Sequence, residues 1–246
     1  MKKYTKILIA LIISLSFFLG TKNINAKEVV YTNDNGVELD RYEYAFFIKV
    51  YGSKFLQYLD EDTYNQYSDI DFETVEVQSQ RYASGAQTRD DGTFFSSPVK
   101  GIVISKFCGI LCRVVTTATW YSEPSVKSYD VMGIYLNGPT RLNTPATVAY
   151  SSIASSDAST TKYDSNGHGF GAVVKLPQGE DVVITQSFTY TGSGTINGTY
   201  QHAMSQSSLT LAQQFDLSPI GFGGVLDFYG DAYDIYDDMP GVYITV

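Results

Sequence analysis

Histidine and cysteine are scarce in this chain of 246 residues, which has two of each. A structural zinc site generally takes four Cys or His ligands, and no third metal ligand accompanies His168 and His202. The H-E-x-x-H motif of zinc proteases and the G-x-S-x-G turn of many serine hydrolases are both absent. We therefore interpret the two histidines as structural, and the sequence offers no catalytic residue, no metal site and no cofactor-binding motif.

Long apolar runs are also scarce, with one exception at the start of the chain. Residues 7–20 read ILIALIISLSFFLG, three lysines precede them, and a small residue, Ala26, follows. This order predicts a secretory signal peptide at residues 1–26, cleaved after Ala26. A membrane-spanning helix needs about 20 apolar residues, so the run is short for a permanent anchor. We expect a soluble, extracellular product.

Basic residues are few relative to acidic ones, 17 against 26. Cleavage after Ala26 removes four lysines and no acid, which leaves 13 basic residues and a formal net charge of −13. Such a chain repels phosphate backbones and anionic head groups, so we expect neither nucleic-acid binding nor stable membrane insertion. An extracellular protein or glycan is the expected partner.

The segment 27–72 has the pattern of a short helical hairpin. Asp40 followed by Glu43 resembles a capping box at a helix start. Aromatic and aliphatic residues then recur at spacings of three and four, which predicts one helix from about Asp40 to Leu59 with an apolar face. Asp60 or Asp62 is placed to cap a second, shorter helix. The apolar positions of the first helix are Tyr42, Phe46, Phe47, Val50, Tyr51, Phe55 and Tyr58.

From about residue 73 to residue 246 the apolar period falls to two. Short β-branched and aromatic runs alternate with Gly-, Pro- and Asn-containing turns, which predicts an antiparallel β-sandwich, jelly-roll-like, with the helices packed on it. In residues 182–191, Ile184, Phe188 and Tyr190 share a predicted core face and the threonines share a wet face. Residues 151–167 are rich in Ser and Thr, and we predict a mobile loop, with a solvated strand as the alternative. The predicted strands are 101–107, 113–121, 128–136, 146–154, 169–177, 182–191, 194–203 and 223–230.

Carboxylates gather in residues 227–238, DFYGDAYDIYDD, where four of the five aspartates offer the oxygen ligands that calcium prefers. The spacing of a calcium-binding loop is absent, so we interpret the run as a solvated acidic loop. The aspartates concerned are Asp231, Asp234, Asp237 and Asp238.

The two cysteines lie in KFCGILCRVV, between two predicted strands. Cys108 and Cys112 are spaced too widely for a C-x-x-C redox pair, and an extracellular compartment favours oxidation. We predict a disulfide that closes the hairpin. Phe107, Ile110 and Leu111 then form an apolar tip, for which two interpretations stand: a contact point for a partner, or side chains that fold back into the core. We expect the second, with a large loss of stability when Ile110 and Leu111 become serine.

Four stretches, NGVEL, SYDVMG, NGHGFGAVVKLP and TYQHA, together with the leader, resemble an uncharacterised family of exported proteins from Gram-positive bacteria. The similarity covers nearly the whole mature chain. It implies export and one recurring architecture, and it implies no activity or site.

Three classes of function fit these observations. The preferred one is a secreted, non-enzymatic binding protein, because catalytic signatures are absent and 20 tyrosines supply rigid contact area. The second is a membrane-active protein, since the alternating Ser/Thr runs approach the ~10 residues of a spanning strand. The third is a hydrolase that uses a carboxylate with His168 or His202.

Overall fold

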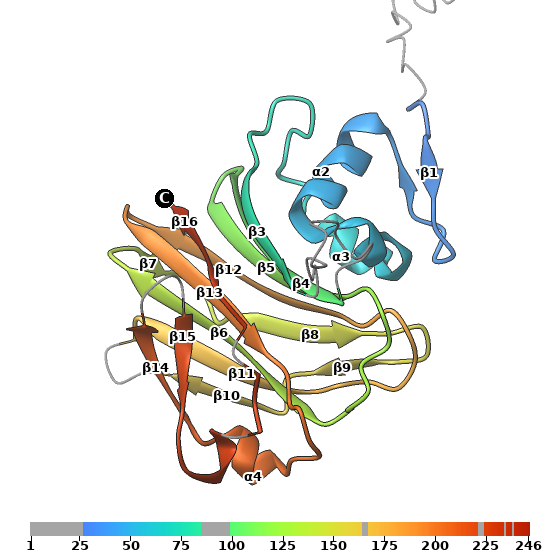
Figure 1. Ribbon diagram of the computed structural model, residues 1–246. Helices are drawn as coiled ribbons and strands as arrows, with labels where there is room; N and C mark the ends of the chain where they lie inside the picture. Colours follow the sequence, from blue (N-terminus) through green and yellow to red (C-terminus); the bar gives the residue numbers. More distant parts are fainter. Residues whose placement is uncertain (1–26, 85–98, 164–166, 221–223, 234, 238) are drawn as a thin grey trace, which may run out of the picture.

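The computed structural model describes residues 27–84, 99–163, 167–220, 224–233, 235–237 and 239–246 (Figure 1). The predicted signal peptide, Asp234 and Asp238 lie outside these ranges. The described part is mainly β and antiparallel, which confirms the predicted sandwich. No helix in these ranges is long and apolar enough to cross a membrane.

Two antiparallel sheets form the sandwich. The first has the order β3-β4-β5-β12-β8-β9, with the two-residue strand β7 also pairing with β12. The second has the order β10-β11-β6-β13-β16. The strands of the first sheet are β3 (Gln78–Ser84), β4 (Lys100–Cys108), β5 (Cys112–Trp120), β7 (Thr140–Arg141), β8 (Ala146–Tyr150), β9 (Ser155–Asp157) and β12 (Val183–Thr191), and those of the second are β6 (Tyr129–Asn137), β10 (Thr160–Tyr163), β11 (Gly169–Lys175), β13 (Thr195–Gln201) and β16 (Val242–Thr245).

The main core lies between the two sheets and draws buried side chains from both. Ile184, Phe188 and Tyr190 of β12 point into it, as the alternating pattern predicted. The Phe188 ring meets the Phe170 ring edge to face, with centroids 5.4 Å apart. The opposite face of β12, which was predicted to be solvated, is partly buried. Val183 on that face lies in a second apolar cluster with the N-terminal helices.

The N-terminal segment begins with a ribbon of β1 (Tyr31–Thr32) and β2 (Glu38–Leu39), followed by α2 (Arg41–Tyr51), the 3₁₀ helix η1 (Ser53–Tyr58) and α3 (Glu61–Asn65). The capping box is confirmed: an Asp40 carboxylate oxygen accepts from the Glu43 backbone N–H at 3.0 Å, and Glu43 accepts from the Asp40 N–H at 2.8 Å. The single helix expected up to Leu59 is interrupted. Gly52 has φ of 86°, which ends α2 and redirects the chain into η1.

The aromatic side of these helices packs on the outer face of the first sheet (Figure 1). Phe46 of α2 meets Phe107 of β4 edge to face at 4.9 Å between ring centroids. Val115 of β5 is fully buried in the same cluster. The N-terminal helices and the first sheet therefore share a second apolar core, which contains the aromatic side chains of the helices.

A third apolar cluster covers the outer face of the second sheet. It is formed by α4 (Leu209–Ala212), the hairpin of β14 (Phe215–Ile220) and β15 (Gly224–Phe228), and the 3₁₀ helix η2 (Gly230–Ala232). A Cβ atom at Gly171 of β11 would lie 2.6 Å from the Phe215 ring. A glycine is required there because the ring rests directly on the strand backbone.

The Ser/Thr-rich segment 151–167 is not a loop throughout. It contains β9, which pairs with β8, and β10, which pairs with β11, so the solvated-strand alternative is the correct one for these residues. Each strand joins one sheet at its edge, where one side of the backbone is satisfied by pairing and polar side chains face water.

Candidate functional site

The β4–β5 hairpin carries the predicted disulfide. Cys108 and Cys112 are directly opposite each other in the register, with Cα atoms 4.0 Å apart, and their sulfur atoms are bonded. The prediction of a hairpin closed at its neck is confirmed. Three residues, Gly109 to Leu111, remain for the turn, and the Gly109 N–H donates to the Leu111 carbonyl at 3.2 Å.

The base of this hairpin is fixed to the helical layer. Phe107 is 1% exposed and lies against Phe46 and Tyr67. Arg113 forms an ion pair with Asp69 at 2.7 Å. The turn backbone also packs closely, because a Cβ at Gly109 would lie 2.7 Å from Ile70 Cδ1.

The two tip side chains nevertheless point into water. Ile110 is 85% exposed and Leu111 is 48% exposed. Our expectation that they fold back into the core is therefore wrong, because a three-residue turn closed by a disulfide has too little chain to reverse. The prediction that Phe107 belongs to the apolar tip is also wrong. The alternation of side chains along β4 points Phe107 towards the helices, where it is buried and anchors the hairpin. We use "tip" below for Ile110 and Leu111.

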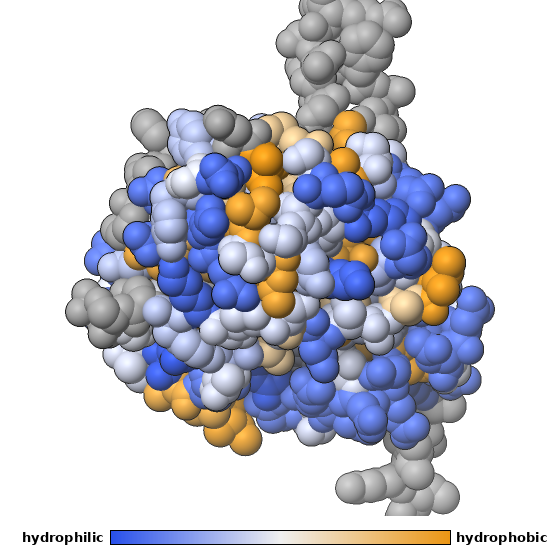
Figure 2. All heavy atoms as spheres, turned by 90° about the horizontal axis from the view of Figure 1, so that it is seen from below, coloured by the Kyte–Doolittle hydropathy of each residue, from blue (hydrophilic) through white to orange (hydrophobic). Residues whose placement is uncertain are grey.

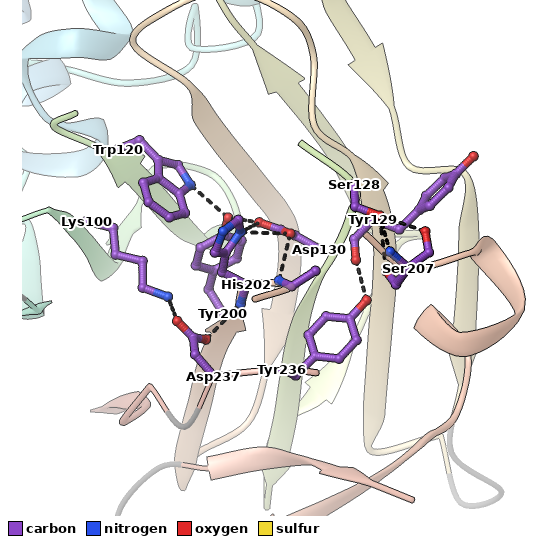
Figure 3. Close-up of polar contacts among 11 residues, drawn as sticks. Lys100, Trp120, Ser128, Tyr129, Asp130, Tyr200, His202, Ser207, Tyr236 and Asp237 are labelled. Carbon is purple, nitrogen blue, oxygen red and sulfur yellow. Dashed lines mark hydrogen bonds and ion pairs between the residues drawn. The ribbon is translucent and has the colours of Figure 1, made fainter. Parts of the chain in front are cut away.

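A buried polar network lies between the two sheets at another point (Figure 3). At its centre is Asp130 of β6, which is fully buried. Its carboxylate accepts hydrogen bonds from the Tyr200 hydroxyl, from the Ala203 backbone N–H at 3.1 Å, and lies 2.9 Å from Nδ1 of His202. The burial of the charge is tolerated because these donors replace water.

The network continues from Tyr200 and His202 into neighbouring elements. The Trp120 indole N–H of β5 donates to the Tyr200 hydroxyl at 2.8 Å. The His202 backbone N–H donates to Asp237 at 2.8 Å, and Asp237 forms an ion pair with Lys100 of β4. These contacts join the first sheet, the second sheet and the C-terminal segment.

Burial changes the acid–base properties of the network. Burial, together with the charge of Asp130, holds the pKa of the Tyr200 hydroxyl well above its usual value, so Tyr200 remains a donor. Burial lowers the pKa of Lys100 to about 8, although the nearby Asp130 carboxylate opposes that shift. Lys100 is therefore largely protonated at neutral pH, as its pairing with Asp237 requires.

The network has the geometry of a structural brace, because its members contact one another across both sheets and the C-terminal segment. The six members are Lys100, Trp120, Asp130, Tyr200, His202 and Asp237. His202 itself is 7% exposed.

The two histidines do not form one site. His168 precedes β11 and its Nδ1 lies 3.3 Å from the Leu136 carbonyl, whereas His202 contacts Asp130. Six residues of β6 separate these two contacts, or about 20 Å at 3.3 Å per residue. Among the described residues, no group of three or more His, Cys, Asp and Glu side chains is arranged to hold a metal ion. In the acidic run, Asp237 belongs to the network and Asp231 is exposed.

Sequence patterns did not reveal Asp130 or Lys100. The available signal was a single acid inside the apolar run 128–136, in a strand whose other residues are mostly buried. A buried aspartate in such a run requires partners, which here are Tyr200 of β13 and His202, just after that strand.

The surface seen from below the view of Figure 1 shows apolar residues in separate small patches among polar ones (Figure 2). Scattered apolar patches of this kind are normal on folded proteins. This face adds no extended apolar contact area.

No family model and no curated protein matches the chain. A solved structure described as "pH-induced modulation of Streptococcus parasanguinis adhesion by Fap1 fimbriae" is similar at 15% identity, over 70% of this chain and 95% of that chain, with a TM-score of 0.32. A likeness at this TM-score carries no functional argument.

Proposed function

We propose that the chain is an exported, non-enzymatic binding protein that engages a partner protein through the tip of the β4–β5 hairpin. The observation that carries this proposal is the exposure of Ile110 and Leu111 on a hairpin fixed at its neck and base. Export is supported by the leader pattern at residues 1–26 and by the disulfide, which persists in oxidising compartments.

The tip is suited to contact a partner because it is held rigidly. The disulfide, the buried Phe107 and the Arg113–Asp69 ion pair order the tip before any partner arrives. A pre-ordered contact loses little conformational entropy on binding. Burial of the parts of Ile110 and Leu111 that are still exposed contributes roughly 2–4 kcal/mol, which is enough for an anchor in a preformed pocket.

A protein pocket fits the tip better than a glycan or a lipid surface. Aliphatic side chains offer no hydrogen bonds to sugar hydroxyls. The acidic chain is repelled by anionic head groups. The partner is therefore expected to present an apolar pocket on a protein surface.

Photo-crosslinking in the secreting culture tests this proposal. A crosslinking amino acid is placed at position 110 and, as a matched control, at Ile153, which is 74% exposed and follows β8 at the other end of the first sheet. The partner captured at position 110 is then purified and titrated against the wild-type chain and the Ile110→Ser/Leu111→Ser variant. We expect at least a tenfold loss of affinity in the variant and none in Ile153→Ser. Equal crosslinking at both positions, or unchanged affinity of the tip variant, would contradict the proposal.

A further inference from the structure

A small pocket lies at the end of the β4–β5 hairpin that is remote from the tip. It has a volume of about 90 Å³ and lies between the end of α2, at Tyr51, and strands β3, β4 and β5. Seven residues of β4 separate Gly101 in the pocket from Cys108 at the neck, a distance of about 23 Å at 3.3 Å per residue. The pocket and the tip are thus separate places on the molecule.

The strand register explains how the pocket is built. Arg81 pairs with Val103, which pairs with Thr117, so these three share one row across β3, β4 and β5. Ala83, Gly101 and Thr119 form the next row. Paired residues point to the same face, and both rows lie on the helix side of the sheet, where they line the pocket.

Two features at the pocket are unexplained by the fold alone. Thr117 is 1% exposed, and its Oγ1 has no hydrogen-bond partner among the described residues. A buried hydroxyl without a partner is uncommon in folded proteins and points to a missing polar group. The second feature is Gly101, whose missing side chain leaves the pocket open. A Cβ atom there would lie 3.3 Å from the Tyr121 ring and 3.1 Å from the Tyr82 carbonyl.

The pocket is lined by a basic residue, whereas the chain as a whole is acidic. The described lining residues include Arg81 and no carboxylate, although acidic residues outnumber basic ones in the sequence. Within the described ranges Arg81 has no ion pair and is exposed, which leaves its guanidinium free to bind an anion. Arginine binds carboxylates through two parallel hydrogen bonds, and threonine hydroxyls add further donors.

We propose that this pocket binds a terminal carboxylate group, with Arg81 as its charge partner and Thr117 as a hydroxyl donor. The volume is below the 300–1,000 Å³ typical of sites that enclose a whole small molecule. The pocket therefore takes the end of a larger ligand, and the Tyr121 ring at the rim contacts the body behind it. Peptide C-termini and acidic sugars share this chemistry.

Backbone-amide NMR titration of the full mature chain tests the site. The probes are N-acetylleucine and its neutral amide, for a peptide end, and glucuronic acid and neutral glucose, for a sugar end. We expect one carboxylate, or both, to shift the amide signals of Gly101, Thr117 and Thr119 saturably, and its neutral counterpart to bind at least tenfold more weakly. Binding by the amino-acid probe alone or the sugar probe alone identifies the source.

Matched variants separate a binding role from a structural one. Arg81→Gln is expected to weaken the carboxylate at least tenfold, whereas Lys175→Gln, the same charge change at an exposed site on β11, leaves affinity unchanged. Thr117→Val is expected to weaken binding while the melting temperature stays equal or rises, because an unpartnered hydroxyl is removed. The Ile110→Ser/Leu111→Ser variant should bind the carboxylate normally, so failure at the tip and failure here are distinguishable. The proposal is overturned if neither carboxylate shifts these signals, if neutral probes bind equally, or if Arg81→Gln and Lys175→Gln behave alike.

Discussion

At the residue scale, the β4–β5 hairpin carries apolar side chains that contribute very differently to stability. Ile110 and Leu111 project from it into water, whereas Phe107, at the base, is enclosed by aromatic rings. Sequence alone does not separate these roles, since all three are large apolar residues within five positions. The separation arises from the direction in which each backbone position points, and that is decided by the register of β4 and by the disulfide.

The first prediction concerns this contrast. Ile110→Ser/Leu111→Ser is expected to change the free energy of unfolding by no more than about 0.5 kcal/mol per site, because exposed side chains contribute little to stability. Phe107→Ala is expected to cost about 3–5 kcal/mol, as for other buried aromatic truncations. Denaturant unfolding of both variants measures the difference. A large loss in the tip variant would show that the tip packs against the protein.

The second prediction concerns Asp130. Asp130→Ala leaves the Tyr200 hydroxyl, the Ala203 N–H and the His202 ring without their acceptor, in a fully buried position. We expect a loss of about 3–5 kcal/mol, the usual cost of breaking a buried charged group away from its partners. Urea unfolding measures this loss, with the exposed Asp157→Ala as the control. Equal stability of the two variants would mean that the network does not brace the sheets.

At the element scale, local signals predicted the starts of helices better than their ends. The Asp40–Glu43 capping box marks the beginning of α2 because it depends on side chains three residues apart. The interruption at Gly52 was missed, since the aromatic spacing continues through it and only the positive φ reveals the break. The strands β9 and β10 were only the alternative to a loop, because their residues are polar and show no apolar alternation, although each pairs with a strand close in sequence, β8 and β11.

The third prediction concerns the helical layer, for which the boundary at residue 72 remains a proposal. Deleting residues 27–70 is expected to expose Phe107, Val115 and Val183, which are buried in the shared cluster. An uncovered apolar sheet face favours association, so the truncated chain should aggregate or lose its cooperative melting transition. Size-exclusion chromatography and thermal melting measure both. A monomer with unchanged melting would show that the helices are an independent unit.

At the scale of the whole molecule, several buried tyrosine hydroxyls make the stability of the fold depend on pH. Burial raises the pKa of Tyr67 and of Tyr236 to about 12, and holds the pKa of Tyr51 and Tyr200 well above the ordinary value. Their unfolded pKa is about 10. The stability that depends on their protonated form is complete below pH 10 and is lost as the pH rises towards 12.

The fourth prediction follows from that sign. Between pH 10 and 12 the free energy of unfolding is expected to fall by roughly 1.4 kcal/mol per pH unit for each such tyrosine, because the unfolded chain releases these protons first. Tyrosinate absorbance should rise abruptly at the pH where the chain unfolds. Tyr236→Phe should reduce the slope. A gradual absorbance rise centred near pH 10, without unfolding, would show that these hydroxyls are open to water.

The polar strands β9 and β10 have a consequence for the behaviour of the chain in concentrated solution. An edge strand offers unpaired backbone groups to any neighbouring copy, and flat apolar edges promote edge-to-edge aggregation. β9 and β10 each lie at one edge of a sheet and carry Ser, Thr, Asp and Lys, and the Lys162 ammonium of β10 lies 3.3 Å from Asp216. The composition that made residues 151–167 resemble a loop thus disfavours edge-to-edge pairing with another copy of the chain at these two edges.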